Sequence, residues 1–283
     1  MGIAHLILTH TNPGQLSRLI QRLAYDGADF YVHVDLKTDI GQFKAVAGME
    51  HVHFVQKRVK VNWGGYSIVQ ATLNGLEEIL ATGTPYDYIN LLSGQDYPIK
   101  STGEIHKFFA NNRGKIFMHT LSVENEWQEA ITRVTQYHLP DVRFPGKHKT
   151  LGMINKLAPR RKMPMGLEPV GRSQWFTIPL PCAKYIVEYV QQHPAVTRFF
   201  KMSWAPDEMI FQTILYNSPW KKDMVNDNLV YVDWSNGGAS PKTLTMADAK
   251  VLEQSGKLFA RKFNAEIDTE ILTLLDQKND QLL

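Results

Sequence analysis

The sequence predicts an α/β fold with a central mixed sheet flanked by helices. In the first part of the chain, short apolar runs of strand length alternate with stretches whose apolar residues recur at helical spacing. Several of these runs end in turn residues, as the strands of nucleotide-binding sheets do. The length of 283 residues, 43% of them hydrophobic and 21% charged, suits one large α/β domain or two small ones. We expect one domain over residues 1–283, with a nucleotide-binding part at about 1–118 and a second part at about 119–283.

Bulk composition excludes several kinds of protein. The single cysteine, Cys182, rules out an internal disulfide and suits a reducing compartment. A formal net charge of +3 is too small to indicate a nucleic-acid partner. The apolar start at residues 2–8 lacks the basic region of a signal peptide, and no run reaches the length of about 18 apolar residues that a membrane span needs. We therefore expect a cytoplasmic protein, or one bound peripherally to the inner face of the membrane.

The first elements are a strand, a helix and two more strands. Residues 3–9 form an apolar run, after which Asn12 as N-cap and Pro13 at the first helical position predict a helix to about Tyr25. Residues 30–34 predict a second strand, and residues 52–55 a short third one.

The next elements are marked by capping patterns. Ser67 with Gln70 predicts a capped helix, and a buried strand at 86–92 and a turn at 93–98 follow. Ser101 with Glu104 predicts another helix, before a strand at 115–118.

The second part is less regular until residue 174. Strands are predicted at 174–178 and 229–233, and helices over 186–190 and from Pro206 onward. Thr245 with Asp248 predicts one more capped helix, and a polar C-terminal helix follows.

Residues 142–167 contain seven Lys and Arg residues and no acidic residue, together with three prolines and three glycines. This composition predicts an irregular, mobile segment. Two interpretations remain open: a solvated surface loop, or a flap that attracts an anionic glycan, a lipid-linked diphosphate or an acidic membrane surface.

No strong catalytic motif is present. The sequence has no phosphate-binding glycine loop, no Cys and His spacing for zinc, and no nucleophile elbow. Asp35 ends the second strand, where a carboxylate can bind ribose or base, although an Asp that caps its own turn is the alternative. Trp63 precedes Gly64 and Gly65. Its ring can stack on a base, or it can pack the next helix against the sheet.

Three further segments carry candidate side chains. Asp96 follows a buried strand and can bind a sugar hydroxyl or simply stabilise its turn. Asp207 and Glu208 begin a predicted helix, whose positive end keeps carboxylates ionised, as a general base requires; acids at helix starts also occur for stability alone. Arg261 and Lys262 can neutralise a diphosphate leaving group, or belong to a solvated surface.

Taken in this order, the segments resemble the core-2/I-branching β-1,6-N-acetylglucosaminyltransferase family, which also includes peptide O-xylosyltransferases. The most specific stretches are 91–100, 206–208 and 258–263. The resemblance implies a GT-A-like fold without the metal-binding Asp-x-Asp of related enzymes. It also implies inversion, in which an α-linked UDP-sugar gives a β-linked product. The second part of the chain, 119–283, then holds the catalytic and acceptor-binding groups.

The resemblance implies roles for individual residues. Glu208 falls on the family's catalytic base, Lys262 on its diphosphate-binding lysine, Asp35 on its uridine contact and Trp63 on a neighbour of the uracil. Further expected UDP-sugar contacts are Thr9, His10 and Arg261, and the expected sugar or acceptor contacts are Asp96, Trp175, Trp204 and Asp207.

The expected donor is UDP-N-acetylglucosamine or UDP-xylose, the acceptor is a carbohydrate or glycolipid, and neither a metal nor another cofactor is expected. The chain lacks the Golgi anchor and disulfides of animal members, so it resembles a bacterial-type relative. It also has Leu229, Val230 and Tyr231 where many relatives have a basic residue, so a second phosphate ligand must come from Lys242 or Arg261, or be missing. Two alternatives are a metal-dependent transferase that uses Asp35 or Asp96, and an inactive sugar-nucleotide-binding protein.

Overall fold

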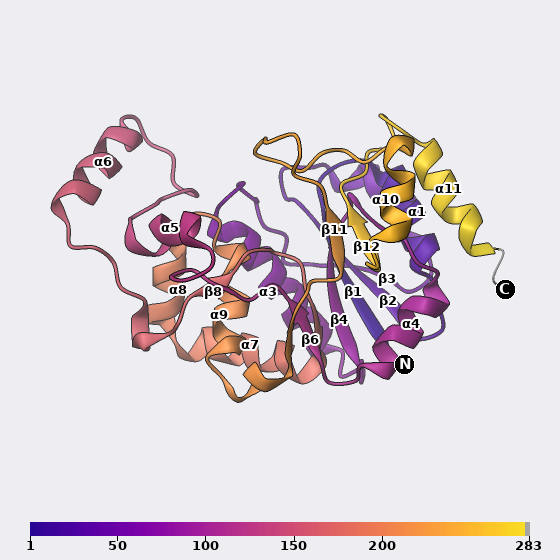
Figure 1. The fold of residues 1–283 in the computed structure, drawn as a ribbon, viewed down its shortest axis with the longest axis horizontal. Coiled ribbons are helices and arrows are strands. Elements are labelled where there is room, and N and C mark those ends of the chain that lie inside the picture. Colours follow the sequence, from indigo (N-terminus) through magenta and orange to yellow (C-terminus); the bar gives the residue numbers. More distant parts are fainter. Residues whose placement is uncertain (281–283) are drawn as a thin grey trace.

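A seven-stranded mixed sheet forms the centre of the computed structural model, which describes residues 1–280 (Figure 1). The strand order is β10-β6-β9-β4-β1-β2-β3. The strands are β1 (Ile3–Thr9), β2 (Ala28–Val34), β3 (Val52–Phe54), β4 (Tyr88–Ser93), β6 (Ile116–Met118), β9 (Thr177–Pro179) and β10 (Met224–Asn226). β9 runs antiparallel to its neighbours β4 and β6, whereas the other pairs are parallel. The predicted α/β fold with a central mixed sheet is confirmed.

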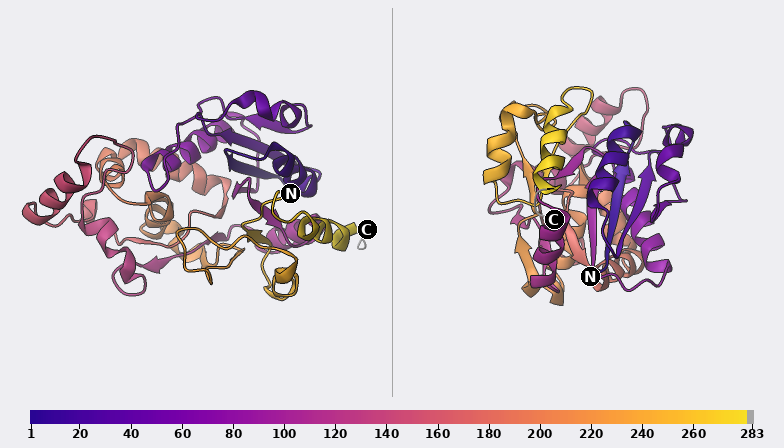
Figure 2. Two further views of the ribbon diagram at one scale, coloured as in Figure 1. Left: turned by 90° about the horizontal axis from the view of Figure 1, so that it is seen from above. Right: turned by 90° about the vertical axis from the view of Figure 1, so that its right-hand side faces the viewer.

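Helices cover both faces of this sheet (Figure 2). The chain passes from β1 through α1 to β2, and later from β3 through α3 to β4 on the other side of β1. Because such crossovers are right-handed, the two helices lie on opposite faces. The helices are α1 (Pro13–Leu23), α2 (Lys44–Ala47), α3 (Tyr66–Ala81), α4 (Thr102–Asn111), α5 (Ile131–Thr135), α6 (Lys147–Leu157), α7 (Leu180–Gln192), α8 (Pro194–Lys201), α9 (Ile210–Tyr216), α10 (Ala249–Gln254) and α11 (Glu270–Asp280).

Two smaller sheets extend the fold. β5 (Asp96–Pro98) pairs antiparallel with β12 (Phe259–Arg261), which pairs parallel with β11 (Val230–Val232). β7 (Leu121–Ser122) pairs with β8 (Val170–Gly171). The simple turn predicted at 93–98 is therefore wrong from residue 96 onward, because those residues pair with a strand about 160 residues later, which local sequence does not reveal.

Three of the four predicted helix starts are confirmed. Asn12 caps α1 by accepting the Gln15 N–H at 3.0 Å, and capping boxes form at Ser101 and Thr245. The Ser67 capping box is wrong: the N-cap of α3 is Gly65, two residues before Ser67, and the Ser67 side chain bonds to a residue distant in sequence instead.

The basic segment differs most from prediction. Residues 147–157 form the helix α6 rather than an irregular loop. Leu151 and Ile154 give this stretch a weak helical periodicity, but no side chain caps its start after Gly146, so the usual sequence signal is missing.

One contiguous apolar core runs through the molecule. It includes Ile3 on β1, Phe211 on α9 and Leu275 on α11, and so joins residues from both predicted parts of the chain. Among residues 1–280, no helix combines the length and the apolar character that crossing a bilayer requires.

Candidate functional site

The carboxyl ends of three parallel strands meet at one edge of the main sheet. The Asp35 N–H, after β2, donates to the Thr9 carbonyl at the end of β1, at 2.9 Å. The Gly94 N–H, after β4, donates to the Leu8 carbonyl at 3.0 Å. A Cβ on Gly94 would lie 2.6 Å from Thr9 Oγ1, so only glycine allows this approach. Thr9 and Asp35 thus lie together where sheets of this class bind nucleotides.

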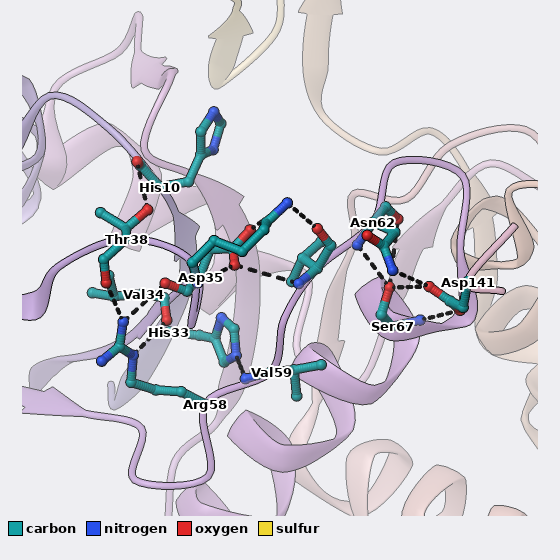
Figure 3. A network of polar contacts seen from close by, with 12 residues as sticks. His10, His33, Val34, Asp35, Thr38, Arg58, Val59, Asn62, Ser67 and Asp141 are labelled. Carbon is teal, nitrogen blue, oxygen red and sulfur yellow. Dashed lines mark hydrogen bonds and ion pairs between the residues drawn. The ribbon is translucent and has the colours of Figure 1, made fainter. Parts of the chain in front are cut away.

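The Asp35 carboxylate is buried and already paired (Figure 3). Its Oδ1 accepts the Lys37 N–H at 2.9 Å, which is the turn contact that the alternative interpretation expects. The Lys37 ammonium lies 3.4 Å from Oδ2. His10 is exposed beside this turn, and its carbonyl accepts the Thr38 hydroxyl at 3.0 Å. Asp35 and His10 are therefore close together, as predicted.

Arg58 organises the same loop and was not predicted. Its guanidinium donates to the carbonyls of Val34, Asp35 and Thr38 at 2.8, 2.9 and 2.6 Å (Figure 3). Behind it, burial lowers the pKa of His33 to about 4, so the neutral ring accepts the Val59 N–H at 2.9 Å. No sequence spacing links Arg58 to the strand that it holds.

Trp63 and Trp204 form an aromatic pair next to this edge. Their rings meet edge to face with centroids 5.1 Å apart, and Trp63 is 68% exposed. A Cβ on Gly64 would lie 2.8 Å from the Trp204 ring. The Trp204 ring therefore fills the space beside Gly64. Trp63 keeps an exposed ring available for a base.

Asp141 fixes the start of α3 and was also not predicted (Figure 3). Its carboxylate accepts the Ser67 N–H at 3.0 Å, the Ser67 hydroxyl at 2.6 Å and the Asn62 amide at 3.0 Å. A Cβ on Gly65 would lie 2.2 Å from its Oδ1. Both glycines of this loop thus make room for side chains from the second part of the chain.

Glu208 ends a short 3-10 turn at residues 206–208. Ala205 precedes it with a positive φ of 45° and donates its N–H to the Gly64 carbonyl at 2.8 Å. The Glu208 carboxylate pairs with Arg133 Nη1 at 2.5 Å, and Arg133 also lies over the Trp127 ring at 4.7 Å. The Arg133 guanidinium thus fixes the position of the Glu208 carboxylate. Arg133 lies 75 residues before Glu208, without a motif that could reveal it.

Asp207 occupies a different environment. It is buried, and its Oδ1 has no hydrogen-bond partner. Burial, with a further contribution from the neighbouring Glu208 carboxylate, raises the pKa of Asp207 to about 7. The contact of Asp207 with an acceptor stays a prediction.

Asp96 and Trp175 are buried against Arg261. Asp96 is 0% exposed; its Oδ2 accepts the Ser93 N–H at 2.8 Å and its Oδ1 lies 3.0 Å from Arg261 Nε, although this pair lacks hydrogen-bond alignment. Burial raises the pKa of Asp96 to about 6, and Arg261 opposes this shift. The Arg261 guanidinium lies 4.3 Å from the Trp175 ring centroid. Asp96 and Trp175 both position Arg261, and their contacts with a sugar stay predictions.

Lys262 follows directly after Arg261, the last residue of β12, which is the middle strand of the three-stranded sheet. Its ammonium donates to the Ser240 hydroxyl at 3.0 Å. Lys242, the other candidate for a second phosphate ligand, is bound to Asp248 at 2.6 Å and lies 3.8 Å from Asp233. Lys242 is thus neutralised by two carboxylates, which leaves Arg261 beside Lys262.

Residues 172–175 connect the Glu208 turn with Arg261. The Arg172 N–H donates to the Glu208 carbonyl at 3.0 Å, and a Cβ on Gly171 would lie 2.1 Å from that oxygen. Trp175, three residues later, contacts Arg261. Three extended residues span at most about 10 Å. The same short segment therefore contacts the backbone of the candidate base and the guanidinium of Arg261.

Among residues 1–280, no three His, Cys, Asp or Glu side chains gather in an arrangement that could hold a metal ion.

The sequence model of the Core-2/I-Branching enzyme family matches residues 3–255. This chain belongs to the core-2/I-branching enzyme family. The predicted family resemblance is confirmed. The matched residues include Thr9 and Asp35 at the strand ends and the turn that carries Glu208, whereas Arg261 and Lys262 lie just beyond them.

Two relatives of this core-2/I-branching chain are similar over nearly its full length. Xylosyltransferase 2 of Rattus norvegicus is 27% identical over 298 residues, which cover 97% of this chain and 33% of that protein. Xylosyltransferase oxt of Drosophila melanogaster is 25% identical over 286 residues, which cover 93% of this chain and 32% of that protein. The chain thus spans about a third of the length of the curated relatives it matches. Among solved structures, mouse xyloside xylosyltransferase 1 in its apo form aligns with a TM-score of 0.40 and 11% identity, covering 91% of this chain and 97% of that one.

Proposed function

We propose that this protein is an inverting, metal-independent glycosyltransferase that moves N-acetylglucosamine or xylose from a UDP-sugar to a carbohydrate hydroxyl. The observation that carries the proposal is the placement of Glu208. Its carboxylate is held by Arg133, and its carbonyl is held by the segment that leads to Arg261 and Lys262. A base and a cationic site for a leaving group are the two parts that a single displacement needs.

The donor nucleotide lies, in this proposal, over the strand ends at Thr9 and Asp35. The exposed ring of Trp63 is the surface on which the uracil stacks. The Trp63 loop also contacts the Glu208 turn, since the Gly64 carbonyl accepts the Ala205 N–H. This contact supports a sugar position between the nucleotide site and Glu208.

The reaction is a one-step substitution. The acceptor oxygen forms a bond to the anomeric carbon while Glu208 takes its proton, and the bond from that carbon to the UDP oxygen breaks. The electron pair leaves with UDP, and the charge that develops on the diphosphate is stabilised by Lys262 and Arg261. Attack from the face opposite UDP gives the β-linked product.

Two donor sugars, xylose and N-acetylglucosamine, are candidates. The two relatives described above are named xylosyltransferases, which favours xylose, whereas the family model carries the core-2/I-branching name. We infer a carbohydrate or glycolipid acceptor. The metal-dependent alternative would need Asp35 or Asp96 as a ligand, and each already lies beside a cation, Lys37 or Arg261.

A panel of UDP-sugars tests the donor. A ligand that binds only the folded state raises the melting temperature by mass action. The donor should stabilise the protein, and turnover with it should persist in EDTA. Loss of all activity in EDTA would contradict the metal-independent mechanism.

The variant Glu208→Gln tests the base. Turnover should fall by about 10²- to 10⁴-fold while UDP affinity is unchanged, because the substitution removes only the proton acceptor. Glu129→Gln is the matched control, since Glu129 is exposed and lies near Arg172.

Lys262→Ala should lower kcat even with saturating acceptor. Unchanged turnover in Glu208→Gln, or an effect of Lys262→Ala on acceptor KM alone, would contradict these roles.

A further inference from the structure

The helix α6 stands away from the body of the molecule at the end opposite α4 and α11 (Figures 1 and 2). None of its residues is buried. A cavity of about 250 Å³ separates it from α5, lined by residues that include Thr135 and Arg160. Asn155 provides its main polar attachment, exchanging two hydrogen bonds of 2.7 and 2.9 Å with the backbone of Tyr137. Most of α6 therefore does not take part in the packing of the apolar core.

Apolar side chains are exposed on this part of the molecule. Among residues 1–280, 14 large hydrophobic residues are exposed, and five of them fall within residues 142–165. These five are Val142, Phe144, Met153, Leu157 and Met165. Leu157 is 76% exposed and Met153 is 59% exposed, and their spacing of four residues makes them neighbours on α6. Such a concentration of exposed apolar side chains indicates a surface that binds something.

Cations surround these apolar side chains. Arg143, Lys147, Lys149, Lys156, Arg160 and Lys162 make no ion pair with any carboxylate of residues 1–277, whose side chains the structure describes. Lys149 and Lys156 lie three to four residues from Met153, so the exposed side of α6 presents two lysines beside Met153 and Leu157. No acidic residue occurs between 142 and 167.

We propose that this face, comprising residues 142–160 and centred on α6, docks on an anionic phospholipid surface. Met153 and Leu157 enter the boundary between headgroups and acyl chains, and Lys149 and Lys156 contact the lipid phosphates. A soluble polyanion would satisfy the lysines but would leave the two apolar side chains in water, whereas a bilayer interface accommodates both. The inference is independent of the proposed transfer reaction.

Both ends of the segment are anchored to elements that carry the candidate site. Asp141 binds the start of α3, and Arg161 donates to the carbonyl of Met202, shortly before Trp204. Docking through α6 therefore fixes the orientation of the Glu208 region relative to the lipid surface.

Sedimentation with vesicles tests the proposal. The whole protein is mixed with vesicles of phosphatidylcholine alone or with added phosphatidylglycerol, at about 0.1 M and about 1 M salt, where screening lengths are about 10 and 3 Å. We expect binding only to the anionic vesicles and only at the lower salt. The double variant Lys149→Glu with Lys156→Glu should lose at least about 25-fold in affinity, at roughly fivefold for each lysine. Met153→Ser with Leu157→Ser should also weaken binding, by about tenfold or more.

Matched controls change exposed lysines and exposed apolar residues outside the proposed docking face. Lys107→Glu with Lys250→Glu alters the net charge equally on α4 and α10, and Met246→Ser with Val251→Ser removes two other exposed apolar side chains. These controls should bind like the parent, and circular dichroism should show that every variant is folded.

Three outcomes would overturn the proposal. These are no binding of the parent to anionic vesicles, an equal loss in the charge control, and unchanged vesicle binding of the Met153 and Leu157 variant. Equal affinity for soluble polyphosphate, together with that last result, would assign the surface to a polyanion instead.

Discussion

Arg161 lies buried between α5 and the end of α8, although it belongs to a run of three basic residues. It is 8% exposed, and its Nη1 donates to the carbonyls of Gln136 and Met202 at 2.8 and 2.6 Å. Its Nη2 donates to the Phe199 carbonyl, and its guanidinium lies 3.9 Å from the Phe199 ring centroid. Burial lowers the pKa of Arg161 to about 10, which still leaves it charged at neutral pH.

Arg161→Ala should therefore destabilise the fold by about 2–4 kcal/mol, because several buried carbonyls would lose their donor. Arg160→Ala, one residue earlier and exposed, should change the free energy of unfolding by less than about 0.5 kcal/mol. Urea denaturation measures both. Equal stability of the two variants would show that the buried hydrogen bonds of Arg161 contribute nothing.

Asp207 should make stability depend on pH. Its pKa is about 7 in the folded protein against 3.8 as the ordinary value, so the folded state binds more protons between pH about 4 and 7. Stability from this group is thus fully present below pH about 4 and is lost as pH rises to about 7. Asp207→Asn should be less sensitive to pH in this window, measured by urea denaturation at both ends. Asp26→Asn, at an exposed turn, is the control; identical pH dependence in Asp207→Asn and the parent would contradict the prediction.

At the scale of elements, β8 holds the turn that carries Glu208. Gly171 on β8 packs directly against the Glu208 carbonyl, and the next N–H donates to it. The contact is between backbone atoms, so a side chain at residue 171 cannot be accommodated by rotating a neighbour.

Gly171→Ala should cost about 1–3 kcal/mol through overpacking. It should also lower turnover by about 100-fold, because a shift of about 1 Å at Glu208 misplaces the base. Gly152→Ala is the matched control, since a Cβ there meets nothing within 4 Å and alanine favours the helix α6 by roughly 0.5–1 kcal/mol. Thermal denaturation and an initial-rate assay distinguish the two variants. Normal turnover in Gly171→Ala would show that the packing of β8 against the Glu208 turn does not affect the reaction.

At the scale of the whole molecule, the two predicted parts share one core. The apolar cluster continues from Ile3 to Leu275, and Asp141 binds α3 across the boundary between the parts. We expect a single cooperative unfolding transition, with coincident midpoints by far-ultraviolet circular dichroism and tryptophan fluorescence. Five of the six tryptophans lie in the second part, so separate unfolding of the two parts would give different midpoints and would contradict this prediction.

The α/β class, the main strands, two capping boxes and the family could all be predicted from the sequence. These features depend on local spacing, such as the apolar run at residues 3–9 and the pairing of Ser101 with Glu104. Three contacts could not be predicted and appear only in the folded chain: Trp204 covers Gly64, Asp141 rather than a local capping box fixes α3, and Arg133 holds Glu208. Each of these contacts joins residues 74 or more positions apart. Because burial and pairing depend on what the rest of the chain places beside a residue, the sequence could nominate Asp96, Asp207 and Arg161 as polar groups but not show that all three are buried.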